Sequence, residues 1–196
     1  MLLKQEFFKI DKWYGGKQEW LSEAGYISKK KADKSCGVAA AANLLQYLVR
    51  ENSELEKLSY GHSKESYIEL MIKLYQFLKP RFYGIPTIRK MKKGILNYVA
   101  SKGGHLKAYS KIWIFCHRDR TEFIKEAILN GYPVLLLTWN FPDPQLKNHW
   151  VIVTGWEEID SEEFMVVSNW GYKKTYSYTN WINQKSLFKG ALYFTK

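Results

Sequence analysis

The sequence predicts an α+β fold with a helical first part and a mostly β second part. Apolar residues recur at helical spacing before residue 132, whereas the later segments are short runs rich in Val, Ile, Thr and aromatic residues, separated by turn residues. The length of 196 residues suits a single core. We therefore expect one domain over residues 1–196, with a helical lobe at about 1–131, a β lobe at about 132–196 and a cleft between the lobes.

The central helix is expected to begin at Cys36. Residues 36–49 carry no charge, and a helix that is apolar on nearly all sides belongs in a core. The residues before it mix aromatics, lysines and Gly15-Gly16 without a sustained period, which predicts irregular structure with one short helix near residues 17–21.

Three further helices are predicted, each followed by a Gly or Pro that ends it. They cover residues 64–78, 88–102 and 119–131. Ser63 and Thr87 are suitable N-caps for the first two, and the third begins at Asp119 with Glu122 as a capping-box partner. All of the predicted helices therefore precede residue 132.

After residue 132 the pattern becomes that of antiparallel strands. These strands are predicted at residues 133–139, 149–156, 163–169, 174–180 and 191–195. Residues 109–116 form a further candidate strand.

The composition carries a basic excess, with 30 Lys and Arg residues against 19 Asp and Glu and a formal charge of +11. Such a charge favours an acidic partner, although general solubility explains it equally well. The lysines form short clusters at residues 29–34 and 90–93 without a nucleic-acid-binding motif around them. No specific nucleic-acid binding is therefore predicted.

No segment of the chain predicts export or membrane insertion. The first residues become charged before the apolar core of a signal peptide can form, and the longest apolar run, residues 133–137, is too short for a membrane span. We expect a cytoplasmic protein, unless an upstream leader has been removed. The 2 Cys and 4 His residues show no metal-ligand spacing, so neither a metal nor another cofactor is expected.

Cys36 stands where a thiol ionises easily. It begins the uncharged helix, whose unpaired N–H groups and dipole favour an anion, and the thiolate is the nucleophilic form of cysteine. Taken alone, a buried structural cysteine is the more common explanation. His149 at the start of a strand and Asn169 before a turn are likewise ordinary when each is taken singly.

The three residues together resemble the papain-like cysteine peptidases, which use the same order of Cys, His and Asn. The resemblance is carried by the strings Ser35-Cys36-Gly37, Asn148-His149-Trp150 and Ser168-Asn169-Trp170-Gly171. These strings are most similar to the bacterial branch related to the bacteriocin-processing peptidases. The resemblance implies a papain-like fold and a peptide or protein substrate.

The resemblance also implies a role for each site residue. Cys36 is expected to be the nucleophile, His149 its proton partner and Asn169 the residue that orients the imidazole. Trp170 is expected to shield the hydrogen bond between Asn169 and His149 from water.

Two positions depart from the pattern of that family. The family has a Gln about six residues before the Cys as an oxyanion-hole donor, where this sequence has Lys30, so Lys30 is the candidate and Gln18 would serve if its loop folded back. The family also places the orienting residue two positions before Trp-Gly, which is Ser168 here. A one-residue shift reverses the face of a strand unless a bulge intervenes, so Ser168 is a possible substitute for Asn169.

Cys116 is adjacent to His117, but neighbours on an extended chain point apart, so we expect Cys116 to be structural. The first hypothesis is a cysteine peptidase that acts through an acyl-enzyme. The alternatives are a Cys-dependent acyltransferase and a catalytically inactive papain-like module that binds an acidic partner.

Overall fold

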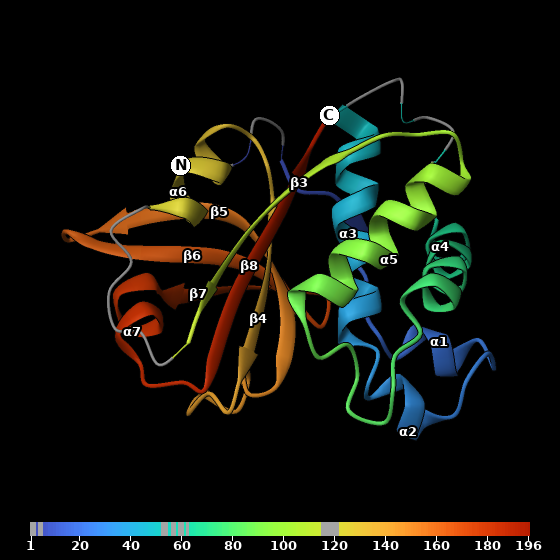
Figure 1. Ribbon diagram of the computed structural model, residues 1–196, viewed down its shortest axis with the longest axis horizontal. Helices are drawn as coiled ribbons and strands as arrows, with labels where there is room; N and C mark the ends of the chain where they lie inside the picture. The colour runs from blue at the N-terminus through green and yellow to red at the C-terminus, as the bar shows by residue number, and fades with distance from the viewer. Residues whose placement is uncertain are drawn as a thin grey trace.

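The computed structural model describes residues 3, 6–51, 55, 58, 61, 63–114 and 122–196. Its helices are α1 (Trp20–Glu23), α2 (Lys29–Ala32), α3 (Cys36–Glu51), α4 (Lys64–Leu78), α5 (Ile88–Ser101), α6 (Phe123–Leu129) and α7 (Tyr178–Asn183). Its strands are β1 (Lys9–Ile10), β2 (Trp13–Tyr14), β3 (Lys107–Trp113), β4 (Val134–Trp139), β5 (His149–Ile159), β6 (Glu162–Asn169), β7 (Tyr172–Ser177) and β8 (Phe188–Thr195). Helices α1 to α5 lie on one side and a large sheet on the other (Figure 1), so the chain is α+β as predicted.

Helix α3 forms the centre of the helical side, as its lack of charge predicts. Residues 37–48 are all buried, and α4 and α5 pack against this helix. The predicted N-caps of α4 and α5 are present. The side-chain oxygens of Ser63 and Thr87 each accept a hydrogen bond from a backbone N–H of the first turn.

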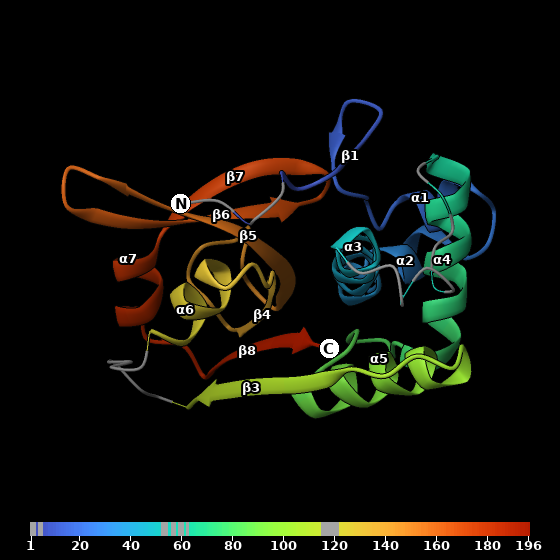
Figure 2. The same cartoon turned by 90° about the horizontal axis from the view of Figure 1, so that it is seen from above.

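The large sheet is antiparallel and has the strand order β3-β8-β4-β5-β6-β7. It curves strongly, with α6 and α7 in its hollow and α3 on the outer side of β5 (Figure 2). Strands β1 and β2 form a separate small hairpin. Because α3 packs against β5 and β4, the start of the central helix meets the start of β5.

The boundary between the lobes differs from the prediction. Strand β3 precedes residue 132 but pairs with β8 along its whole length, at the edge of the sheet. The candidate strand at 109–116 is thereby confirmed for the part that the structure describes. The division at residues 131 and 132 does not coincide with the edge of the sheet, because β3 pairs with β8 and α6 packs against β4 and β5.

The segment predicted as a strand at 174–180 is divided between β7 and α7. Ser177 ends the strand and caps the helix by accepting a backbone N–H of its first turn at 3.2 Å. Tyr178, Trp181 and Ile182 then follow at helical spacing and are buried. Helix α7 therefore contradicts the expectation that every helix precedes residue 132.

Three short helices differ in detail from the prediction. Helix α1 corresponds to the short helix expected near residues 17–21, whereas α2 was not predicted. Helix α6 begins at Phe123, with Glu122 as a left-handed N-cap (φ 43°) that makes no side-chain capping hydrogen bond. The capping-box role predicted for Glu122 is therefore wrong, and Asp119 lies outside the described residues.

Candidate active site

Cys36 is the first residue of α3, and its side chain is half-buried. No acidic residue lies in the first turn of this helix, so no carboxylate competes for its N–H groups and its dipole. The backbone N–H of Gly37 contributes to lowering the pKa of the Cys36 thiol. The local sequence therefore builds a position at Cys36 that favours an anion.

Gly37 lets the sheet approach the start of α3. A Cβ at this position would lie 2.8 Å from Ile85 Cδ1 and 3.0 Å from Trp150 Cδ1, closer than real side chains tolerate. Trp150 is also held by a hydrogen bond from its Nε1 to the Ile85 carbonyl oxygen at 2.7 Å. This close packing places His149, the preceding residue of β5, beside Cys36.

A hydrogen bond joins His149 to Asn169, with Nε2 and Oδ1 2.8 Å apart. Asn169 Nδ2 donates to the Gln145 carbonyl oxygen and to Tyr176 Oη, each at 3.4 Å. Because these acceptors orient the amide, Oδ1 faces the ring and His149 Nε2 is the donor. The other ring nitrogen, Nδ1, is left for the side-chain hydrogen bond between His149 and Cys36.

A β-bulge decides which residue of β6 faces His149. Paired residues of antiparallel strands share a face, and neighbouring residues alternate. The register next to the β5–β6 turn, continued without interruption, would put Ser168 on the face of His149. The bulge at Thr154 shifts this register by one residue and pairs Ser168 with Ile152, which faces the other way. Asn169 therefore faces the imidazole.

The ring of Trp170 packs against the ring of His149. Asn169 pairs with Tyr172, so Trp170 and Gly171 form a two-residue turn between β6 and β7. Both turn residues have positive φ, 51° and 76°, as a type I′ turn requires. The turn brings the Trp170 ring to 4.7 Å from the His149 ring, measured between centroids.

The environment favours the ionised forms of Cys36 and His149. Burial is the largest single influence on Cys36 and opposes ionisation, but the charge and hydrogen bond of His149, with the backbone N–H groups of Trp150 and Gly37, outweigh it and lower the pKa of the thiol. Burial also opposes the charged form of His149, yet Cys36 and the hydrogen bond of Asn169 raise its pKa. Each group therefore favours the ionised form of the other, and the two titrations are coupled.

Gln18, not Lys30, lies beside this pair. Its side chain lines the pocket with Cys36 and His149, is only 6% exposed, and has an Oε1 without a hydrogen-bond partner among the described residues. Lys30 is exposed on α2 and does not line the pocket. Its predicted place near the thiol is therefore wrong, because α2 buries only Ala32 and turns its lysines to water.

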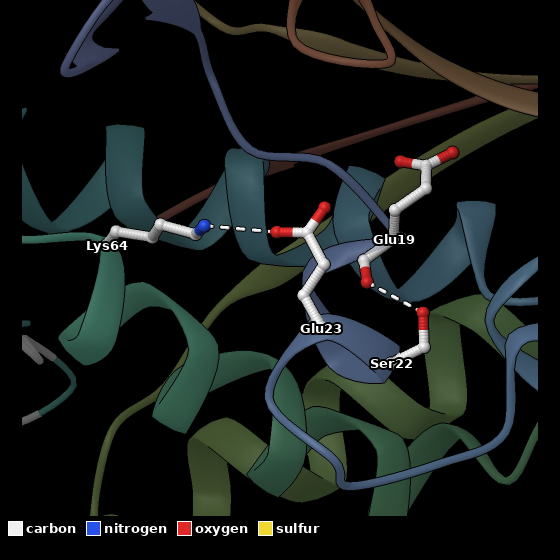
Figure 3. Close-up of polar contacts among 4 residues, drawn as sticks. All are labelled: Glu19, Ser22, Glu23 and Lys64. Atoms are coloured by element: carbon white, nitrogen blue, oxygen red, sulfur yellow. Dashed lines mark hydrogen bonds and ion pairs between the residues drawn. The ribbon is translucent and has the colours of Figure 1, made fainter.

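The helix that follows Gln18 is tied to the helical lobe (Figure 3). Lys64 Nζ, at the start of α4, donates to Glu23 Oε2 at 3.0 Å, and Ser22 Oγ donates to the Glu19 carbonyl oxygen at 2.8 Å. The Glu19 carboxylate points away from the ion pair in Figure 3. One ion pair therefore joins α1, which follows Gln18, to α4.

Ser168 does not contact His149. Its Oγ donates to the Tyr14 carbonyl oxygen at 2.6 Å and accepts from Asn43 Nδ2 at 3.4 Å. The prediction that Ser168 can substitute for Asn169 is therefore wrong for this geometry.

A pocket of ≈ 860 Å³ opens on Cys36, His149 and Gln18. One wall comes from residues 83–87 of the helical lobe, and the other comes from β4 and residues 144–148 of the sheet lobe. Its apolar and aromatic lining includes Tyr83, Ile85, Pro86, Leu137 and Trp139, and its charged lining residues are Asp33, Lys34 and Lys147. This volume lies within the range that is usual for ligand pockets.

Gln145 and Tyr176 were not predicted from the sequence. Neither stands in a recognisable motif, and their contact with Asn169 arises only where the loop before β5 meets β7 in space. A second shared contact, from Tyr176 Oη to Gln145 Oε1 at 2.9 Å, links the two supporting residues to each other.

Two general features concern the described residues only. In these ranges, no group of three or more His, Cys, Asp or Glu side chains is placed to hold a metal ion. No helix among them is long and apolar enough to cross a bilayer. Cys116 and His117 lie outside the described residues.

Comparison with known proteins gives a distant structural likeness and no match in sequence. No protein-family model matches the sequence, and no curated protein sequence matches it significantly. Among solved structures, the crystal structure of the Pseudomonas avirulence protein AvrPphB is similar over 85% of this chain and 94% of that chain, with 12% sequence identity and a TM-score of 0.39. The interpretation of the site therefore rests on its own geometry.

Proposed function

We propose that this protein is a papain-like cysteine peptidase that hydrolyses peptide or amide bonds through an acyl-enzyme. The observation that carries the proposal is the hydrogen-bonded series Cys36–His149–Asn169, which begins at a helix N-terminus and opens on a large pocket. Helix α3 and strands β5 and β6 each contribute one residue, which a structural cysteine does not require. The local strings around these residues support a relationship to the bacteriocin-processing branch.

The chemistry follows from the order of the groups. His149 Nδ1 takes the thiol proton, and the Cys36 thiolate attacks the carbonyl carbon of the scissile amide. The Cys36 backbone N–H and the Gln18 side-chain amide donate to the oxyanion that forms. The C–N bond then breaks, and the His149 imidazolium protonates the leaving amine.

The second half of the reaction regenerates the enzyme. His149 takes a proton from water, and the resulting hydroxide attacks the thioester carbonyl. The C–S bond breaks, the carboxylic acid product leaves, and Cys36 returns to its thiolate form. Asn169 keeps the imidazole oriented in both halves, and Trp170 keeps bulk water away from the hydrogen bond that does so.

This geometry removes the main observation that favoured the hypothesis of a catalytically inactive binding module. That hypothesis depended on Lys30 at the position of the family's Gln, whereas Gln18 lies beside Cys36 and His149. The acidic partner suggested by the net charge becomes an acidic substrate in our proposal. Lys34 and Lys147 line the pocket against a single carboxylate, Asp33, so an acidic residue near the scissile bond is favoured.

A library of quenched fluorescent peptides, incubated with the full chain and read by mass spectrometry, tests the proposal. We expect turnover that Cys36→Ala abolishes and that the matched control Cys116→Ala retains. Release of free acids indicates hydrolysis, whereas products joined to an added amine indicate acyl transfer, since the same thioester serves both. Absence of turnover, with Cys36 and Cys116 alkylated equally slowly at mildly acidic pH, would overturn the proposal.

A further inference from the structure

Gln18 and Cys36 line the same pocket although a long segment of the chain separates them. Residues 19–35 form α1, α2 and the turns around them, so local geometry does not set the distance between the two residues. A donor in an oxyanion hole must be placed within a fraction of an ångström, and a flexible loop of this length does not do so by itself. Long-range contacts must therefore hold the segment that carries Gln18.

These contacts come from a buried group, the Asn43 cluster, which consists of Gly15, Gly16, Asn43, Tyr67 and Ser168. Asn43 Oδ1 accepts from the Gly16 N–H at 2.8 Å and from Tyr67 Oη at 2.7 Å, and Asn43 Nδ2 donates to Ser168 Oγ at 3.4 Å. Helix α3, helix α4 and strand β6 thus converge on the backbone two residues before Gln18.

The two glycines are packed too closely to move within this cluster. A Cβ on Gly15, which has φ +77°, would lie 2.8 Å from both Asn43 Oδ1 and Ser168 Oγ. A Cβ on Gly16 would lie 2.0 Å from Tyr67 Cε1. Backbone and side chains are therefore in direct contact, and the segment has one position between the lobes.

The Asn43 cluster also reaches the turn that carries Trp170. Ser168 Oγ donates to the Tyr14 carbonyl oxygen at 2.6 Å, and the Tyr14 N–H donates to the Gly171 carbonyl oxygen at 2.8 Å. A small space of ≈ 20 Å³ separates the cluster from the site, and Gln18, Asn43 and Ser168 line it together with Cys36 and His149. The cluster is therefore adjacent to the site on its buried side.

We propose that the Asn43 cluster is the positioning element of the oxyanion hole, with Asn43 acting through Gly16 on Gln18. The inference rests on the proposed function, since it concerns the donor of that reaction. It also explains Ser168, which the bulge has turned away from His149 and which instead holds the segment before Gln18. Asn43 and Ser168 are positioning residues in this proposal, since they form hydrogen bonds to the segment before Gln18 and to each other.

The variants Asn43→Leu and Ser168→Ala test this inference. Removing one oxyanion donor costs about 100-fold or more in kcat, so we expect Asn43→Leu to lower kcat by about 10- to 100-fold and Ser168→Ala by a smaller factor, with little change in KM. Alkylation of Cys36 by iodoacetamide needs no oxyanion hole, so its rate and pH profile are expected to stay unchanged in both variants.

A matched control separates positioning from loss of stability. Gln46 is also buried on α3 and donates to the Gly61 carbonyl oxygen at 2.7 Å, away from the cluster. Gln46→Leu is expected to lower the unfolding temperature without lowering kcat. In the background of Gln18→Ala, the Asn43→Leu substitution is expected to add no further loss of kcat, because both changes remove the same donor.

Amide hydrogen exchange supplies a readout that does not depend on turnover. Asn43→Leu is expected to speed exchange at Gly16 and its neighbours while α3 remains protected. Unchanged exchange in this segment, or an additive loss of kcat in the double variant, would overturn the inference. Slowed alkylation in Ser168→Ala would also overturn it, because it would mean that Ser168 acts on His149. A wild-type chain without turnover would overturn the proposed function alone, and exchange would still decide the positioning.

Discussion

The indole of Trp170 lies against the imidazole of His149, with ring centroids 4.7 Å apart and planes inclined by 37°. Trp170 adopts a left-handed conformation, φ 51°, at a turn position where Gly or Asn is usual. Such a conformation costs a bulky residue about 1 kcal/mol or more. The turn is therefore less stable than a Gly or Asn turn would be, and it places the indole against the imidazole.

Trp170→Gly is expected to separate activity from stability. Glycine relieves about 1 kcal/mol of backbone strain, which offsets the lost ring packing, so the unfolding temperature should change little. Water then competes for the hydrogen bond between His149 and Asn169, and we expect kcat/KM to fall by about 10-fold.

Asp160→Gly is the matched control, since Asp160 also has positive φ (50°) but lies at the far β5–β6 turn. It should gain stability and keep full activity. A fully active Trp170→Gly variant would contradict a shielding role.

The pH profile of kcat/KM should be broader than free Cys and His side chains would give. The lowered pKa of Cys36 keeps the thiolate present below the ordinary cysteine value of about 8.5, and the raised pKa of His149 keeps the imidazolium present above about 6.5. In our proposal the thiolate–imidazolium pair is the active form, so we expect the acid limb to follow Cys36 and the basic limb to follow His149. Asn169→Ala removes a hydrogen bond that raises the pKa of His149, so the basic limb should move to lower pH. A basic limb that stays in place would argue against this pairing.

Gln18→Ala and Lys30→Ala distinguish the two oxyanion candidates. We expect Gln18→Ala to lower kcat by about 100-fold and leave the alkylation rate of Cys36 unchanged, because alkylation forms no oxyanion. Lys30 is exposed on α2, so Lys30→Ala should leave both rates unchanged. Steady-state kinetics and iodoacetamide labelling measure the two quantities. The reverse result, with only Lys30→Ala impaired, would reinstate the interpretation from sequence spacing.

Lys147→Glu is expected to reverse a preference for acidic peptides. Lys147 and Lys34 line the pocket, so peptides with Glu near the scissile bond should be cleaved several-fold faster than matched peptides with Lys, and added salt should reduce the difference. Lys93→Glu makes the same change of net charge at an exposed position of α5, and Lys93 does not line the pocket. If both variants alter the preference equally, the total charge of the protein is responsible and the pocket is not.

Gly37→Ala should loosen the contact between α3 and β5. Its Cβ would clash with Ile85 and Trp150, so we expect a loss of about 1–3 kcal/mol in the free energy of unfolding and slower alkylation of Cys36 at mildly acidic pH. Gly94→Ala is a matched control, because its Cβ would lie 2.5 Å from Leu78 Cδ2 in the packing of α5 on α4. That variant should lose stability while Cys36 keeps its reactivity. Equal loss of reactivity in both variants would show that general loosening is the cause.

Elements with their own local signal were predictable from the sequence. Helices α3, α4 and α5 have an apolar face and a capping residue or a buried composition, and the strands β4, β5, β6 and β8 have strand-like composition between turns. Strand β3 joins the sheet only through pairing with the last strand of the chain. The lobe boundary depends on that distant pairing, which no local pattern records.

The candidate site divides in the same way. Cys36, His149 and Asn169 stand in short strings that can be compared directly, and the structure brings their side chains together. The spacing along the chain favours Lys30 over Gln18 as the oxyanion-hole donor, because it implies a short loop before Cys36. In the structure, α1 and α2 lie in a longer segment between Gln18 and Cys36. The preference for Asn169 over Ser168 required a bulge, and Thr154, which provides it, has no distinctive sequence around it.

The docking of residues 14–16 between the lobes has a consequence for how a newly made chain acquires its site. Tyr14 is synthesised before its partners Ser168 and Gly171, which follow it by more than 150 residues. The donor group is therefore seated only after β6 and β7 have formed. Until then, the nascent chain lacks the geometry that we propose for cleavage, so any peptidase activity has to wait until residues 162–177 have been made and folded.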